Sequence, residues 1–129
     1  MTPVKKKQDD PAKTALKLAQ KLLRKKGGSL EELRAHHFKD EESAEDEELA
    51  EQLYDKFSAD VARVQEELSK IYGKPLHTGK KDSKHIPLNG VFRYAYWEVG
   101  GKPLFVAAHH EDVGITIILW LGTIGEDCA

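Results

Sequence analysis

Histidines and carboxylates in the C-terminal half of the chain are the residues whose types could bind a metal ion or transfer a proton. They are His77, His85, His109, His110, Glu111 and Asp112. His109 and His110 are neighbours in a predicted strand, so their side chains point to opposite faces and cannot bind one ion without a bulge. The sequence has no His-x-x-x-His pair for a helical zinc site and no Cys-x-x-Cys. It therefore predicts no metal, no cofactor and no catalytic residue.

A metal-dependent or acid/base enzyme is nevertheless one alternative function. Its site would lie at the second predicted turn of the C-terminal strands and would use His85, His109, His110, Glu111 and Asp112. Other catalytic patterns are missing, because no serine lies in a nucleophile elbow and no Gly-rich phosphate loop occurs. The single cysteine, Cys128, has no partner for an internal disulfide.

The elements that must position these residues are predicted between Val91 and Thr123, which read as three strands joined by two tight turns. Gly100 and Gly101 separate two alternating runs, and glycine tolerates the positive φ angles of a two-residue hairpin. The predicted register pairs Val99 with Lys102 and, along the same ladder, Tyr94 with Ala107. For the second hairpin we expect four pairs. They are His110 with Ile115, Ala107 with Ile118, Val106 with Leu119, and Phe105 with Trp120.

This register predicts a sheet that is apolar on both faces. One face is aliphatic and holds Arg93, Ala95, Trp97, Leu104, Val106, Ala108, His110, Ile115, Ile117, Leu119 and Leu121. The other is aromatic and holds Phe92, Tyr94, Tyr96, Phe105, Ala107, His109, Thr116, Ile118 and Trp120. An antiparallel sheet with one face in water usually alternates apolar and polar residues, so both faces of this one need cover.

Three helices are predicted before these strands. Asp10 and Pro11 begin the first, which ends before Gly27. A capping-box spacing at Ser29–Glu32 predicts a short helix through His37, and a continuous apolar stripe predicts a long helix over residues 43–72. Residues 73–90 form a long basic connection. The predicted fold is α+β, with three N-terminal helices followed by a three-stranded antiparallel β-meander.

The chain of 129 residues fits one domain. We expect a flexible basic tail at 1–9, a single domain at 10–125 and a C-terminal tail at 126–129. No apolar run is long enough for a membrane span or a signal peptide, which favours the cytoplasm. The net charge of −2 conceals three blocks: residues 1–40 hold 11 Lys/Arg and 5 Asp/Glu, residues 41–72 hold 3 and 11, and residues 73–129 hold 6 and 6.

The acidic block and the aromatic face together favour protein binding. Seven carboxylates crowd the start of the long helix, more than a helix dipole requires. If all helices pack on the aliphatic face, the aromatic face becomes a surface for a partner or for a homodimer. We therefore predict a non-catalytic, cytoplasmic, bacterial binding module, such as an immunity, inhibitor or adaptor protein. Its predicted binding residues are Phe92, Tyr94, Tyr96, Phe105, Trp120, Glu45 and Glu48.

Weak nucleic-acid binding is a second alternative. It rests on the basic tail and on the lysines of the connection, Lys80, Lys81 and Lys84. The acidic helix would repel phosphate, so we do not expect nucleic acid to be the partner.

Overall fold

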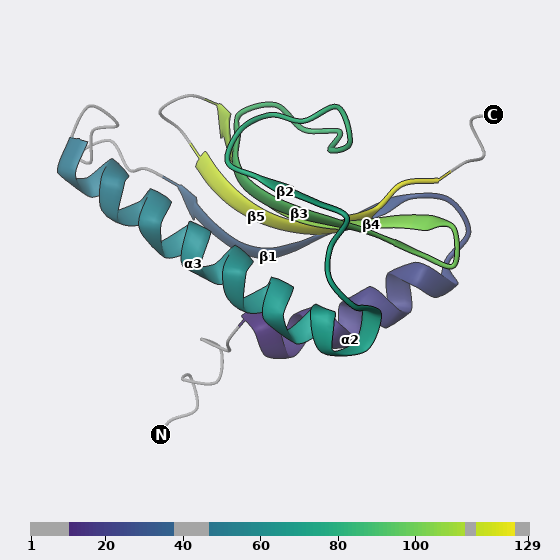
Figure 1. Cartoon of the computed structure of the whole chain (residues 1–129). Helices are drawn as coiled ribbons and strands as arrows, with labels where there is room; N and C mark the ends of the chain where they lie inside the picture. Colours follow the sequence, from purple (N-terminus) through teal and green to yellow (C-terminus); the bar gives the residue numbers. More distant parts are fainter. Residues whose placement is uncertain (1–10, 38–46, 113–115, 126–129) are drawn as a thin grey trace, which may run out of the picture.

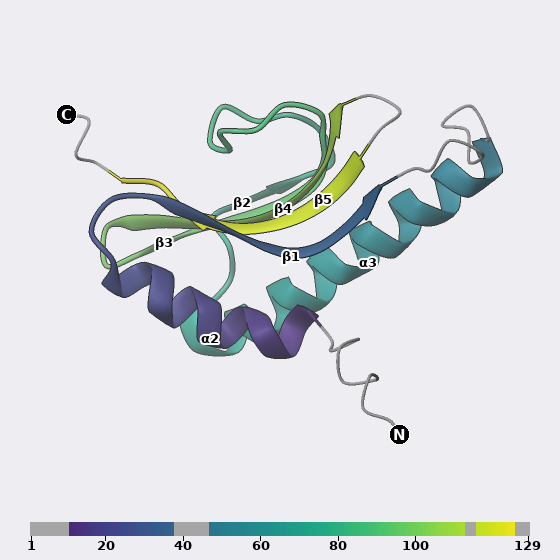
Figure 2. The same ribbon diagram turned by 180° about the vertical axis from the view of Figure 1, so that it is seen from behind.

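The structure, a computed structural model, describes residues 11–37, 47–112 and 116–125. In these ranges the chain forms two helices, α2 (Pro11–Arg24) and α3 (Glu47–Tyr72), and one antiparallel sheet. The strands are β1 (Ser29–His37), β2 (His77–Gly79), β3 (Val91–Val99), β4 (Lys102–Asp112) and β5 (Thr116–Thr123), in the order β1-β5-β4-β3-β2. Both helices lie on one face of this curved sheet (Figures 1 and 2). The fold is α+β, but the prediction of three helices and a three-stranded meander is wrong.

Residues 29–37 form strand β1 instead of the predicted short helix. They pair with β5 from Ser29 opposite Thr123 to His37 opposite Thr116. Because β5 is buried along almost its whole length, its backbone groups need a partner strand on each edge. Pairing with β5 outweighs the helix-start pattern, since helix propensities of ordinary residues differ by only about 0.7 kcal/mol per residue.

Strand β2 is also absent from the prediction. It lies within residues 73–90, the predicted connection. His77 pairs with Tyr96 and Gly79 pairs with Tyr94, so β2 continues the sheet beyond β3. Three residues with no apolar alternation give no strand signal in the sequence. β2 therefore depends on the edge that β3 offers.

The register of the β3–β4 hairpin is as predicted, with Val99 opposite Lys102 and Tyr94 opposite Ala107. The β4–β5 register differs from the prediction by two residues, because Ala107 lies opposite Trp120. The strands extend further toward the turn than expected, to a pair between Asp112 and Thr116, with an irregularity after His110. A shift of two residues preserves the face on which each side chain lies, so the division into two faces survives.

Phe92 is the exception to that division. The register shifts between Val91 and Arg93, which is the mark of a β-bulge. Phe92 packs against the core on the helix side, where its ring centroid lies 4.6 Å from that of Tyr54 in α3. Its predicted place on the aromatic face is wrong because the bulge reverses the alternation there.

The aliphatic face of the sheet is covered by the two helices (Figure 1). The apolar stripe of α3, from Leu53 to Leu68, and the alanine-rich stripe of α2 share one core with Trp97, Val106 and Leu119. The Trp97 indole N–H also donates a hydrogen bond of 2.9 Å to the carbonyl of Gly73. This bond fixes the point at which the chain leaves α3.

The aromatic face is covered by a loop of the same chain. We call residues 80–90 the covering loop; it curls over the face opposite the helices (Figures 1 and 2). Ile86 of the loop is buried with Tyr94, Tyr96, Phe105 and other residues of that face. The sheet is therefore covered on both sides, once by helices and once by the loop.

Replacement of Gly90, the last residue of the covering loop, should destabilise the protein more than replacement of Gly100 in the β3–β4 turn. Both have positive φ, 76° and 61°, so alanine should cost about 1–2 kcal/mol in either position. At Gly90 a Cβ would also lie 2.6 Å from the backbone oxygen of His110, whereas at Gly100 it would meet nothing within 4 Å. Urea unfolding of Gly90→Ala and Gly100→Ala measures the difference, and equal losses of unfolding free energy would contradict this placement of the loop.

Candidate functional site

Three of the predicted partner-binding residues are buried beneath the covering loop. Tyr94, Tyr96 and Phe105 are 8%, 6% and 0% exposed. Trp120, which lies on β5, is only partly buried. The aromatic face is therefore closed over β3 and β4, and its accessible part is at Trp120. The sequence does not predict that the loop covers this face. Its apolar contacts come mainly from Ile86 and Leu88, which stand in an otherwise polar segment.

His109 joins Trp120 to the covering loop. The Trp120 indole N–H, which can only donate, gives a hydrogen bond of 2.9 Å to Nε2 of His109. Nε2 is thus an acceptor, and the imidazole hydrogen lies on Nδ1, which donates to the carbonyl oxygen of Asn89 at 2.9 Å. His109 is buried. The tautomer with its hydrogen on Nδ1 satisfies the hydrogen bonds to both Trp120 and Asn89.

His110 points to the opposite side, toward the helices, as expected for adjacent strand residues. Its Nδ1 lies 2.7 Å from the hydroxyl oxygen of Tyr54, and the two rings meet edge to face at 5.7 Å. Burial, with a smaller contribution from the nearby His109, lowers the pKa of His110 from its ordinary value of 6.5. His110 is therefore a packing and hydrogen-bonding residue on the helix side.

His85 lies apart from both of these histidines. Its ring stacks on that of His77 with 4.1 Å between centroids and 9° between planes, and both rings contact Tyr96. The described histidines of the alternative enzyme site thus lie in three different environments. The side chains of the other two members, Glu111 and Asp112, lie outside the described part of the chain.

The part of the chain that the structure covers also contains no cluster of three or more His, Cys, Asp or Glu residues that could bind a metal ion.

The acidic start of α3 is exposed. Glu48, Glu51 and Asp55 all face solvent at helical spacing, and Glu45 lies outside the described residues. Within the described ranges none of these three carboxylates makes an ion pair. The basic helix α2 lies against the other half of α3 (Figures 1 and 2). The acidic and basic blocks therefore do not neutralise one another at this end of α3.

The pockets of the described residues include two that lie away from the helix–sheet core. One, which we call the loop pocket, has a volume of about 640 Å³. It is lined by His77, Thr78, Gly79, Lys80, Lys81, Asp82, Ser83, Lys84, His85 and Tyr94. Its polar lining was missed as a site, although the sequence does mark residues 73–90 as a long basic connection.

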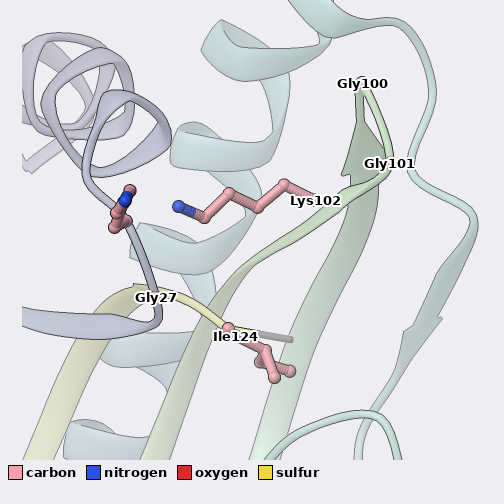
Figure 3. A pocket seen from close by; sticks show the side chains of 7 residues that line it. Gly27, Gly100, Gly101, Lys102 and Ile124 are labelled. Atoms are coloured by element: carbon pink, nitrogen blue, oxygen red, sulfur yellow. The ribbon is translucent and has the colours of Figure 1, made fainter. Parts of the chain in front are cut away.

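The other pocket, of about 550 Å³, lies where three glycine-containing segments meet, around Gly27, Gly100 and Gly125 (Figure 3). Lys102 extends across it from the start of β4 and donates hydrogen bonds to the carbonyl oxygens of Leu22 and Lys25. A cation at this position offsets the negative end of the α2 dipole. This pocket is thus a structural junction whose lysine is already in use.

Comparisons with known proteins identify no relative: no protein-family model, no curated protein and no solved structure matches the chain significantly. Neither described helix is sufficiently long and apolar to cross a membrane. The function must therefore be inferred from the described geometry.

Replacing Trp120 with phenylalanine should destabilise the protein by about 1–3 kcal/mol, because it leaves Nε2 of the buried His109 without its donor. Urea unfolding measures this loss. In the wild-type protein, NMR of the imidazole nitrogens should show the hydrogen of His109 on Nδ1. A hydrogen on Nε2, or a variant as stable as the wild type, would contradict the Trp120–His109–Asn89 arrangement.

The lowered pKa of His110 predicts a pH-dependent stability. The unfolded chain binds this proton more readily than the folded one, so the stabilisation is complete above the ordinary pKa of 6.5 and is lost as the pH falls below it. Replacing His110 with glutamine should make the unfolding free energy decrease less between about pH 7.5 and pH 5 than in the wild type. Urea titrations at several pH values test this, and parallel profiles would refute it.

Proposed function

We propose that this protein is a non-catalytic binding module of the immunity, inhibitor or adaptor type, and that it docks a basic protein partner through the acidic start of α3. The observation that carries the proposal is the exposed stripe of Glu48, Glu51 and Asp55, which forms no ion pair with any residue in the described ranges. Between Asp40 and Asp55 the sequence has nine Asp/Glu and no Lys/Arg. A surface of one charge sign accelerates association with a partner of the opposite sign.

The accessible part of the aromatic face, on the side of the sheet opposite the helices (Figures 1 and 2), is a second and separate contact surface in this proposal. With the covering loop in place, Tyr94, Tyr96 and Phe105 are not available to a partner or to a second copy. Trp120 is accessible in part, and Leu30 on the neighbouring strand β1 is 41% exposed. Partly exposed tryptophan is enriched among residues that dominate binding energies. A cytoplasmic location belongs to the same proposal and is supported by the lone cysteine.

Nucleic-acid binding is a second candidate, favoured by α2. From Pro11 to Leu30 the chain has six Lys/Arg, all exposed, and no Asp/Glu. In the described ranges one of these cations has a carboxylate nearby, Lys21 at 3.9 Å from Glu31. A mobility shift with an oligonucleotide at low salt distinguishes this candidate, since phosphate contacts are strongest there.

The double variant Glu48→Lys, Glu51→Lys should lose the partner. The protein and this variant serve as baits in affinity capture from a lysate of the source organism at low salt, and captured proteins are identified by mass spectrometry. The association rate of the purified partner is then measured at about 0.05 M and about 0.3 M salt. We expect it to fall about tenfold or more with the variant and to fall with added salt for the wild type.

Glu66→Lys, Glu67→Lys is the matched control, because it makes the same charge change in the other half of α3. It should retain the partner, because the acidic start of α3 is unchanged. It should also stay folded, because the ion pair of Glu67 with Lys70 is exposed and contributes little to stability. A partner that both double variants bind equally well, or an association rate insensitive to salt, would contradict docking through the acidic start of α3.

A further inference from the structure

The loop pocket has the composition of an anion site. Its lining includes three lysines, two histidines and three hydroxyl residues, with Asp82 as its one carboxylate. Lys80, Lys81 and Lys84 are exposed, and none of the three has an ion-pair partner in the described part of the chain. The Asp82 carboxylate accepts a hydrogen bond of 2.7 Å from the backbone N–H of Val91. The lysine charges in the pocket thus exceed the single negative charge, which already has a partner.

The walls of the pocket are held in position by the rest of the loop. Asp82 joins the middle of the loop to the start of β3, and the Ser83 hydroxyl oxygen accepts a hydrogen bond of 3.1 Å from the N–H of His85. Directly after His85, Ile86 is buried in the aromatic face and donates its backbone N–H to the carbonyl of Ser83 at 3.1 Å. The lysines are therefore carried by a segment that is anchored on both sides of the pocket.

Both histidines line the pocket. His77 belongs to β2 and His85 to the loop, their rings are stacked at 4.1 Å, and each ring also contacts Tyr96 at a tilt. Imidazole N–H groups and the hydroxyls of Thr78 and Ser83 are donors that suit phosphate oxygens. The volume of about 640 Å³ lies within the range of roughly 300–1,000 Å³ that is usual for small-molecule sites.

We propose that the loop pocket binds a small phosphorylated anion, with Lys81 and Lys84 as its main charge contacts and His77 and His85 as hydrogen-bond donors. The covering loop, which supplies most of the pocket lining, lies on the face of the sheet opposite α2 and α3 (Figures 1 and 2), so this site is separate from the acidic start of α3. The inference is independent of the proposed protein partner, and either can fail without the other.

Pyrophosphate is the probe for this site. In an NMR titration of the full chain we expect saturable shifts confined to residues 77–86 and to the rings of His77 and His85. Isothermal calorimetry should show the double variant Lys81→Gln, Lys84→Gln binding at least about tenfold more weakly, since a charged hydrogen bond is worth about 1.5–3 kcal/mol. These substitutions leave the anchors at Asp82, Ser83 and Ile86 unchanged, and urea unfolding confirms that the variant is folded.

The matched control is Lys25→Gln, Lys26→Gln, which removes the same charge after α2 and should bind pyrophosphate like the wild type. Citrate, a carboxylate of similar charge, should bind more weakly if phosphate geometry is recognised. The proposal is overturned if pyrophosphate causes no saturable shifts at residues 77–86, if both double variants bind equally, if citrate binds as tightly as pyrophosphate, or if only an oligonucleotide binds.

Discussion

A sheet that is apolar on both faces is the constraint on which the rest of this structure depends. Strands β4 and β5 have buried side chains on both faces of the sheet, so each face must be shielded from water. Two helices with small and aliphatic stripes shield one face, and Trp97, Leu104 and Leu119 are fully or almost fully buried there. The other face relies on the covering loop. A loop offers less apolar surface than a helix, and the sheet adds hydrogen bonds that it donates to the Asp82 carboxylate and to the carbonyl oxygens of Asn89 and Gly90.

This arrangement determines which apolar and charged groups remain accessible on the surface. Because Tyr94, Tyr96 and Phe105 pack against the loop, the apolar groups that stay accessible on the described part of that face include Trp120 and Leu30. The acidic start of α3 projects away from the basic helix α2, and the covering loop, whose sequence includes Lys80, Lys81 and Lys84, lies on the other side of the sheet (Figure 1). The net charge of −2 is therefore the sum of separate charged regions of opposite sign.

The sequence predicts the parts of the fold that have strong periodicity. The alternating runs around Gly100 define the β3–β4 hairpin and its register, and the apolar stripe defines α3 and its end at Gly73. Two of the strands could not be predicted in this way. Residues 29–37 combine a helix-start pattern with a strand position that the edge of β5 creates, and β2 forms only because β3 has a free edge.

The candidate sites also divide into features that a local sequence pattern predicts and features that depend on contacts between distant segments. That His109 and His110 face opposite ways is a property of any strand, so the sequence predicts it. The position of Phe92 depends on a bulge, and the burial of Tyr94, Tyr96 and Phe105 depends on where a loop without periodicity folds back. The stacking of His77 on His85 joins residues on β2 and in the loop, and no local pattern indicates it.

The most direct test of this account is an NMR measurement of contacts between the covering loop and the sheet. We expect nuclear Overhauser effects between the Ile86 methyl groups and the aromatic rings of the cluster that includes Tyr94 and Phe105. The His110 amide, which donates to the Gly90 carbonyl at 3.0 Å, should exchange slowly with solvent. Absence of these effects together with rapid exchange of the His110 amide would show that the aromatic face is open, and would contradict the central claim that the loop is its cover.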